Sequence, residues 1–194
     1  MTDPTLDLAA LIGARICHDL VSPVGAIANG LELAALSGGT CGGPEMRLIE
    51  ESCSSAQARL ALFRVAFGTR GAAEETAGPE VVRLVEGYLR DTRLSADWAA
   101  PPPAIPRIEV QIACLGLLCV ETALPRGGQL RFGREAARWT LAATGPRIAP
   151  APSVWAWLEG PPAATAAGAA VTEAADPATA LTPAEVQFPL LGAL

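Results

Sequence analysis

Apolar and small residues recur in the first part of the chain with alternating spacings of four and three positions. The series comprises Leu6, Ala10, Gly13, Cys17, Leu20, Val24, Ile27, Leu31 and Ala34. This spacing returns one side chain per turn to the same side of a helix and is typical of helices packed in bundles. It predicts a helix from Leu6 to about Leu36.

A second series follows a turn. The segment "SGGTCGG", residues 37–43, is rich in helix breakers, and Pro44 after it suits a first helical position. The next apolar positions are Ile49, Cys53, Ala56, Leu60, Phe63 and Phe67. The two helices predict an antiparallel hairpin over residues 1–70. Because one hairpin cannot bury both apolar stripes, we expect a homodimer in which two hairpins form a four-helix bundle.

The pattern changes after a predicted linker at 69–79. Helices are predicted at 80–90, at about 107–124, in "APSVWAWLEG" and in the alanine-rich stretch 163–175. Strands are predicted at 94–98, 128–133 and 138–144, with "PPPAIP" as a loop and "ATALTPAEVQFPLL" as two closing strands around a Thr-Pro turn. Residues 78–194 therefore predict an α/β sandwich with one sheet and helices on a face, and the whole chain is α+β.

Composition narrows the class of protein. The net charge of −6 argues against a nucleic-acid partner, which requires a basic surface. The start "MTDPTLD" lacks a basic signal region, and no uninterrupted apolar run reaches the roughly 20 residues of a membrane span. We therefore expect a cytoplasmic protein without a membrane partner. Five cysteines without a CxxC pair and a single histidine predict reduced thiols and no metal site.

That single histidine, His18, lies in "RICHDLVSPVGAIANGLEL". It falls outside the apolar stripe, so its imidazole is predicted to face water. Asp19 beside it can hold the proton of one ring nitrogen and leave the other to act as a nucleophile. Pro23 removes a backbone N–H inside the predicted helix, at a cost of about 3 kcal/mol, and is expected to kink it. His18 and Asp19 are therefore the candidate catalytic residues.

Residues around His18 predict a docking surface. Ser22 lies one turn away and is a candidate contact for a partner's active site or for water. The small or apolar residues Ala14, Val21 and Gly25 are predicted to seat a partner helix. Arg15 leaves two interpretations open: it contacts phosphate oxygens, or it is an ordinary solvated surface group.

The segment "CHDLVSP" resembles the phospho-accepting box of two-component histidine kinases. It is more similar to ChpT-type histidine phosphotransferases, which resemble this chain also in "RVAFG" (64–68), "ALPRGG" (123–128) and "TGPR" (144–147). The resemblance fades beyond about residue 150. It implies a dimeric phosphorelay protein in which His18 takes a phosphoryl group from the receiver aspartate of a hybrid histidine kinase and passes it to response regulators.

The same resemblance implies roles for the site. Asp19 would orient His18, while Arg15, Val21, Ser22 and Gly25 would contact the receiver. The receiver would supply Mg²⁺, so this chain is expected to need no cofactor and to bind no metal of its own.

The second half resembles a degenerate ATP-binding domain of histidine kinases. Val120 stands where such domains carry a metal-binding asparagine, Ala143 where they carry an adenine-binding aspartate, and Arg147 where they carry a glycine. Valine offers Mg²⁺ no oxygen ligand, so autokinase activity is not expected. A non-catalytic, pseudokinase-like dimer that binds receiver domains is the alternative function, and an ATP-dependent kinase is a weaker one.

Overall fold

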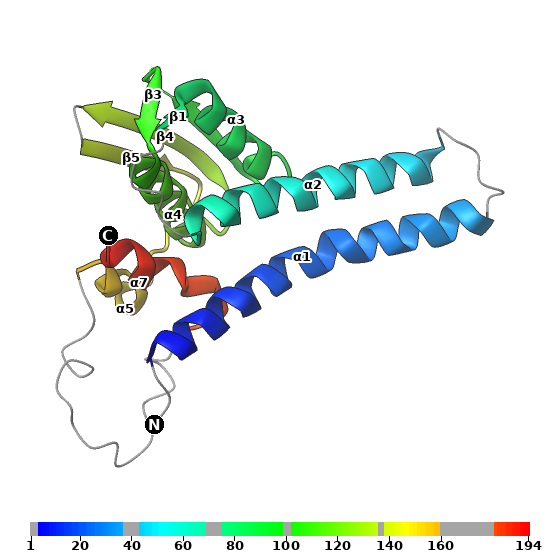
Figure 1. Cartoon of the computed structure of the whole chain (residues 1–194), viewed down its shortest axis with the longest axis horizontal. Helices are drawn as coiled ribbons and strands as arrows, with labels where there is room; N and C mark the ends of the chain where they lie inside the picture. The colour runs from blue at the N-terminus through cyan, green and yellow to red at the C-terminus, as the bar shows by residue number, and fades with distance from the viewer. Residues whose placement is uncertain (1–3, 37–42, 69–74, 99–101, 136–137, 160–180) are drawn as a thin grey trace, which may run out of the picture.

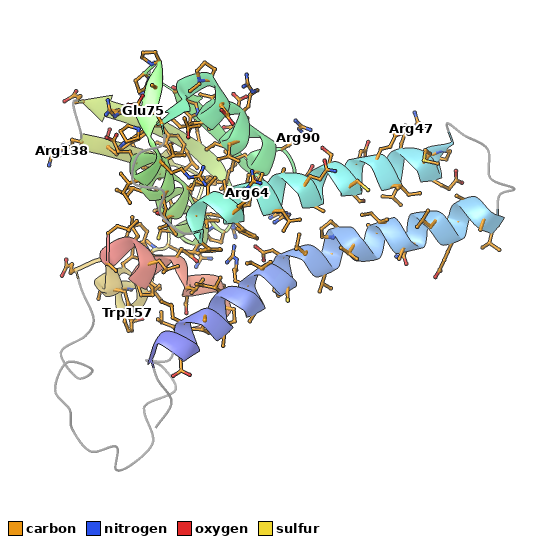
Figure 2. The ribbon with its side chains drawn as sticks, in the orientation of Figure 1. Arg47, Arg64, Glu75, Arg90, Arg138 and Trp157 are labelled. Atoms are coloured by element: carbon orange, nitrogen blue, oxygen red, sulfur yellow. The ribbon has the colours of Figure 1, made fainter. Side chains whose placement is uncertain are left out.

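Two long helices form the hairpin that the spacing predicts. The computed structural model describes residues 4–36, 43–68, 75–98, 102–135, 138–159 and 181–194 (Figure 1). Helix α1 spans Pro4–Leu36, and α2 spans Pro44–Ala66 and returns antiparallel beside it. Figure 2 shows Arg47 near the turn end of the hairpin and Arg64 near the rest of the chain. Helix α1 continues through Pro23 and bends along its length without a break.

The predicted apolar stripe of α1 is not the side that packs against α2. Val24 and Leu31 on this stripe are 55% and 56% exposed. The buried positions of α1 are instead Arg15, Pro23 and Gly30. The spacing therefore predicts the helix correctly, but a single chain covers the stripe only in part: Leu20, Ile27 and Ala34 are partly buried, while Val24 and Leu31 are exposed.

Helix α1 is also long and apolar enough to cross a membrane, by length and composition alone. The most apolar 18-residue window of the segment Asp7–Leu36 has a mean hydropathy of 1.3, and only 11% of that window is buried. The expectation from the sequence was that no uninterrupted apolar run reaches this length. Arg15, His18 and Asp19 do interrupt the run, but the many alanines and leucines of the helix keep its mean hydropathy high.

The remaining elements follow in sequence order. They are β1 (Glu75–Ala77), α3 (Gly78–Leu89), β2 (Leu94–Trp98), β3 (Ala104–Pro106), α4 (Arg107–Ala123), β4 (Gly128–Glu135), β5 (Arg138–Thr144), α5 (Pro152–Trp155), the 3-10 turns η1 (Ala156–Glu159) and η3 (Pro183–Glu185), and α7 (Gln187–Gly192). The helices predicted near 80–90, 107–124 and 152 and the strands at 94, 128 and 138 are all present. The α+β class is confirmed.

The strands form two sheets in the part of the chain that is described, where one was predicted. In the larger sheet β4 pairs with β2 in parallel and with β5 antiparallel. Strands β1 and β3 form a separate antiparallel pair that joins Glu75 to Pro106. Each of these two strands has only three residues, too few for an alternating pattern, so the end of the predicted linker and the loop "PPPAIP" did not reveal them.

Of the two strands predicted near the C-terminus, the second is wrong, and most of the first lies outside the described residues. Residues 183–185 form a 3-10 turn, and residues 187–192 form a short helix. Thr182 and Glu185 form a capping box, with Pro183 at the first position, which is a helix-start signal that outweighs the apolar run behind it. The predicted helix at 163–175 lies outside the described residues.

One hydrophobic core joins the hairpin to the second half. Leu62 and Phe63 of α2 pack in the same cluster as Tyr88 of α3, Leu117 of α4 and Phe132 of β4. All five are at most 2% exposed. The C-terminal part of α2 is therefore fixed against α3 and α4, and α1 is held in turn against α2.

A glycine permits the close approach of α1 and α2. A Cβ atom on Gly30 would lie 2.6 Å from Cγ1 of Ile49, whereas one on Gly25 of the same helix would have no neighbour within 4 Å. Alanine favours a helix over glycine by about 1 kcal/mol at either position. Only at Gly30 must the neighbouring helix move to accommodate it.

We therefore expect Gly25→Ala to raise the free energy of unfolding by about 1 kcal/mol. Gly30→Ala should be less stable than Gly25→Ala by about 1–3 kcal/mol, because the added methyl group displaces Ile49. Urea denaturation at one protein concentration measures both variants. Equal stability of the two would contradict the close contact at Gly30.

Candidate functional site

His18 presents its ring to solvent from the middle of α1. Its side chain is 84% exposed, and Nδ1 lies 2.9 Å from Oδ1 of Asp19. An ionised carboxylate can only accept a hydrogen bond, so this contact requires the proton on Nδ1. That tautomer leaves the lone pair on Nε2, the nitrogen on the far side of the ring from Asp19.

Asp19 lies on the inner side of the same helix. Its side chain is only 9% exposed, and its Oδ2 accepts a hydrogen bond of 2.9 Å from Nε of Arg15. The two residues are four positions apart, the spacing at which helical side chains meet. Both carboxylate oxygens are thus engaged, one by Arg15 and one by His18. Pro23, four residues after Asp19, has no N–H for the carbonyl of Asp19.

Arg15 points into the protein, in contrast to both interpretations drawn from the sequence. Its side chain is 10% exposed. One terminal nitrogen donates a hydrogen bond of 3.1 Å to the carbonyl oxygen of Ala184, and the other lies 4.0 Å from Oε2 of Glu121. The guanidinium therefore joins α1 to η3 and to α4.

The buried Tyr88 and the partly buried Glu121, both in the second half, complete this network. The hydroxyl of Tyr88 donates a hydrogen bond of 2.8 Å to Oε2 of Glu121. Burial raises the pKa of the Glu121 carboxyl, although the bond from Tyr88 and the charge of Arg15 oppose the shift. Burial and the neighbouring Glu121 raise the pKa of Tyr88 well above its usual range. The sequence analysis missed both residues; a lone carboxylate in the otherwise apolar end of α4 was the available signal.

A groove of about 470 Å³ opens beside His18, between α1 and α2. Pro23 and Ser22 border it from α1, and Ser55 and Arg59 border it from α2. The full lining is His18, Asp19, Ser22, Pro23, Ala26, Leu48, Glu51, Ser52, Ser55, Arg59 and Asp91. The polar residues from α2 were missed because the analysis of that helix followed its apolar positions only.

The other predicted docking residues are exposed. Val21 is 69% exposed, and Ala14, Ser22 and Gly25 are exposed as well. Val21 lies three positions from His18, Ala14 and Ser22 lie four positions from it, and Gly25 lies seven. These spacings place all four residues on the same side of α1 as His18. This side differs from the one that carries Val24 and Leu31.

The thiols do not extend the site. Burial raises the pKa of Cys114 and of Cys119 to about 12, so both are protonated at neutral pH. Cys17 is exposed beside His18. Within the described ranges, no three His, Cys, Asp or Glu side chains gather as a metal site.

Comparisons with known proteins identify the family. The sequence pattern described as "Histidine phosphotransferase C-terminal domain" matches residues 78–194, more than half of the chain. The chain belongs to the histidine phosphotransferase family. It is 38% identical to the protein phosphotransferase ChpT of Brucella abortus (strain 2308) over 136 residues, which is 70% of this chain and 64% of that protein. The chain thus matches less than two thirds of the length of this curated relative.

A solved structure agrees with this family membership. The structure is described as that of a bacterial phosphotransferase at 1.7 Å, and it superimposes with a TM-score of 0.71 at 30% identity. The superposition covers 100% of this chain and 88% of the solved one. The resemblance to ChpT-type phosphotransferases inferred from "CHDLVSP" is therefore confirmed.

Proposed function

We propose that this protein is a phosphorelay phosphotransferase that carries the phosphoryl group on Nε2 of His18. The observation that carries the proposal is the pairing of an 84% exposed imidazole with a carboxylate that is only 9% exposed, through a 2.9 Å contact to Nδ1. An ordinary surface histidine does not need a buried partner. Family membership and the name of the Brucella relative support the same reaction class.

The reaction is an in-line displacement at phosphorus. The Nε2 lone pair attacks the phosphorus of a receiver aspartyl phosphate, a P–N bond forms, and the aspartyl C–O–P oxygen leaves with the electron pair as a carboxylate. The ring keeps its Nδ1 proton and gains positive charge, which the Asp19 carboxylate stabilises. Because phosphoryl transfer has a loose transition state, the contribution of the chain is chiefly position and charge. The reverse reaction passes the group to a second receiver.

The exposed side of α1 around His18 is the proposed receiver surface. Val21 and Gly25 offer small and apolar contacts, and Ser22 faces the groove beside the imidazole. We expect the partners to be the receiver domain of a hybrid histidine kinase and response regulators. These receivers would bring the Mg²⁺ that neutralises the phosphoryl oxygens. Such a relay would act in the cytoplasm.

The apolar stripe of α1 supports a homodimer. Val24, Leu31 and Leu60 are 48–56% exposed. On the same side of the hairpin lies an apolar groove of about 590 Å³, to which Ile16 and Leu60 contribute. A second copy would bury these side chains, at about 25 cal/mol for each Å² of apolar area, and complete a four-helix bundle. The stripe also accounts for the apolar character of α1 without a membrane.

The second half is proposed to be an ATP-binding fold without nucleotide chemistry. Val120 and Ala143, which occupy the positions of a metal ligand and an adenine ligand in the resemblance, both pack against the hydrophobic core. They therefore add apolar packing where a kinase requires oxygen atoms. Residues 1–70 would then carry out phosphotransfer, and residues 78–194 would support the structure of the site.

The central prediction concerns the only histidine. His18→Gln should abolish phosphoryl acceptance without unfolding the protein, because the ring is exposed and no second imidazole can replace it. Asp19→Asn should slow transfer by about 10²-fold, since it removes the charge that stabilises the ring. The measurement is the time course of label passing from a phosphorylated receiver to this protein.

Cys17→Ser is the matched control, since it changes an exposed neighbour of His18 without altering the imidazole pair. It should leave the time course unchanged. Uptake of acid-labile phosphate by His18→Gln at the wild-type rate would refute the role of His18. A wild-type protein that binds the phosphorylated receiver but never takes up label would favour the non-catalytic binding module instead.

Leu60→Asp should convert the dimer into a folded monomer. Leu60 is 48% exposed, whereas Phe63 is 2% exposed and belongs to the core of the chain, so only Leu60 tests assembly separately from folding. Ile148→Asp, which changes a side chain 55% exposed in the second half, is the control and should remain dimeric. Sedimentation equilibrium at micromolar concentration distinguishes the two states. A wild-type monomer would contradict the bundle.

The second half should not bind nucleotide. Titration with Mg-ATP is expected to give no heat in calorimetry and no shift in melting temperature, because the residues for metal and adenine are replaced. The same titration of an active histidine kinase provides the positive control. Micromolar binding here would revive the ATP-dependent kinase as the function.

A further inference from the structure

We infer that Arg15 is a positioning residue that fixes the tautomer and orientation of the His18 ring, and that it is itself anchored by the second half of the chain. The inference rests on the proposed function of His18. The sequence offered Arg15 as a surface or phosphate-binding group, but its guanidinium contacts Asp19, Ala184 and Glu121 instead.

The first step is the restraint on Asp19. A carboxylate can rotate about its bond to Cβ, and only one arrangement directs an oxygen at Nδ1 of His18. The 2.9 Å bond from Arg15 to Oδ2 selects the arrangement in which Oδ1 lies 2.9 Å from that nitrogen. Because the hydrogen bond made by one imidazole nitrogen determines the state of the other, Arg15 influences Nε2 without touching it.

The second step is the restraint on Arg15. Its partner Ala184 lies 169 residues away in the sequence, in η3. The carbonyl of Ala184 also accepts a bond of 2.7 Å from Nε2 of Gln187, a fully buried residue whose amide also donates to the carbonyl of Leu118 in α4. The acceptor that receives Arg15 is thereby held by α4. This gives the second half a defined task at the site.

The third step is the shape of the side chain. A planar guanidinium offers donors in several fixed directions, so it can bind Asp19 through Nε and Ala184 through a terminal nitrogen at once. A lysine at this position keeps the charge but concentrates its donors on a single nitrogen. Arg15→Lys therefore separates the role of the positive charge beside Asp19 from the role of the bond to Ala184.

The test uses the 194-residue chain with nitrogen-15 in its histidine. Because the chain has one histidine, two-bond proton–nitrogen NMR spectra report the tautomer of His18 alone. The wild-type ring should carry its neutral-form proton on Nδ1. Asp19→Ala supplies the spectrum of a ring without its partner. This readout needs no receiver, so it remains informative even if the proposed phosphotransfer fails.

Arg15→Met should shift the tautomer equilibrium of the His18 ring toward the one found in Asp19→Ala. It should also lower kcat for transfer from a phosphorylated receiver by about 10-fold to 100-fold, with a smaller change in KM, because Arg15 acts on the ring and not on the partner. Arg15→Lys should lie between wild type and Arg15→Met in both measurements. Arg131→Met, which removes an exposed arginine paired with Asp97, is the control and should match the wild type.

A wild-type tautomer and wild-type kcat in folded Arg15→Met would overturn the inference. If that variant does not fold, Arg15→Lys decides: values equal to the wild type would show that anchoring by the second half is unnecessary, and intermediate values would support it. An altered tautomer in Arg15→Met, in a protein whose wild type takes up no phosphate, would support the inference and refute the phosphotransfer.

Discussion

The ion pair between Arg15 and Asp19 lies where the hairpin meets the rest of the chain, and the arrangement of the site depends on it. Two charged groups are removed from water there, and this desolvation is unfavourable in free energy unless each group has well-directed partners. The partners are an imidazole on one side and the carbonyl of Ala184 on the other. A buried pair of this kind does little for net stability, but it fixes geometry. An exposed imidazole gains a defined orientation from an interaction that lies beneath it.

This arrangement divides α1 into three sides with different tasks. One side carries His18 and the proposed docking residues, a second carries Val24 and Leu31 of the apolar stripe, and a third faces α2 through Pro23 and Gly30. Helical periodicity alone accounts for the division. Gly30 on the inner side permits the close approach of α2, and the exposed Val24 and Leu31 form the surface of the proposed dimer.

The sequence predicted the helices and the larger sheet because their patterns are local. Spacings of four and three marked both long helices, and "CHDLVSP" marked the family and the candidate nucleophile. The inward position of Arg15 could not be predicted in the same way, because it depends on acceptors in α4 and η3 that are distant in sequence. The apolar run after Thr182 was misread as a strand, since a short apolar run does not distinguish a strand from a capped turn of helix.

The bond from Arg15 to Ala184 has a consequence for biosynthesis. The proposed nucleophile, His18, is close in sequence to Arg15, and Arg15 is translated 169 residues before the carbonyl of Ala184 that holds it. A chain still on the ribosome, or one cut before residue 184, can form the long helices and still lack this support for His18. Synthesis through Ala184 is therefore the step at which the imidazole acquires this support, and products that end before Ala184 would carry the histidine without it.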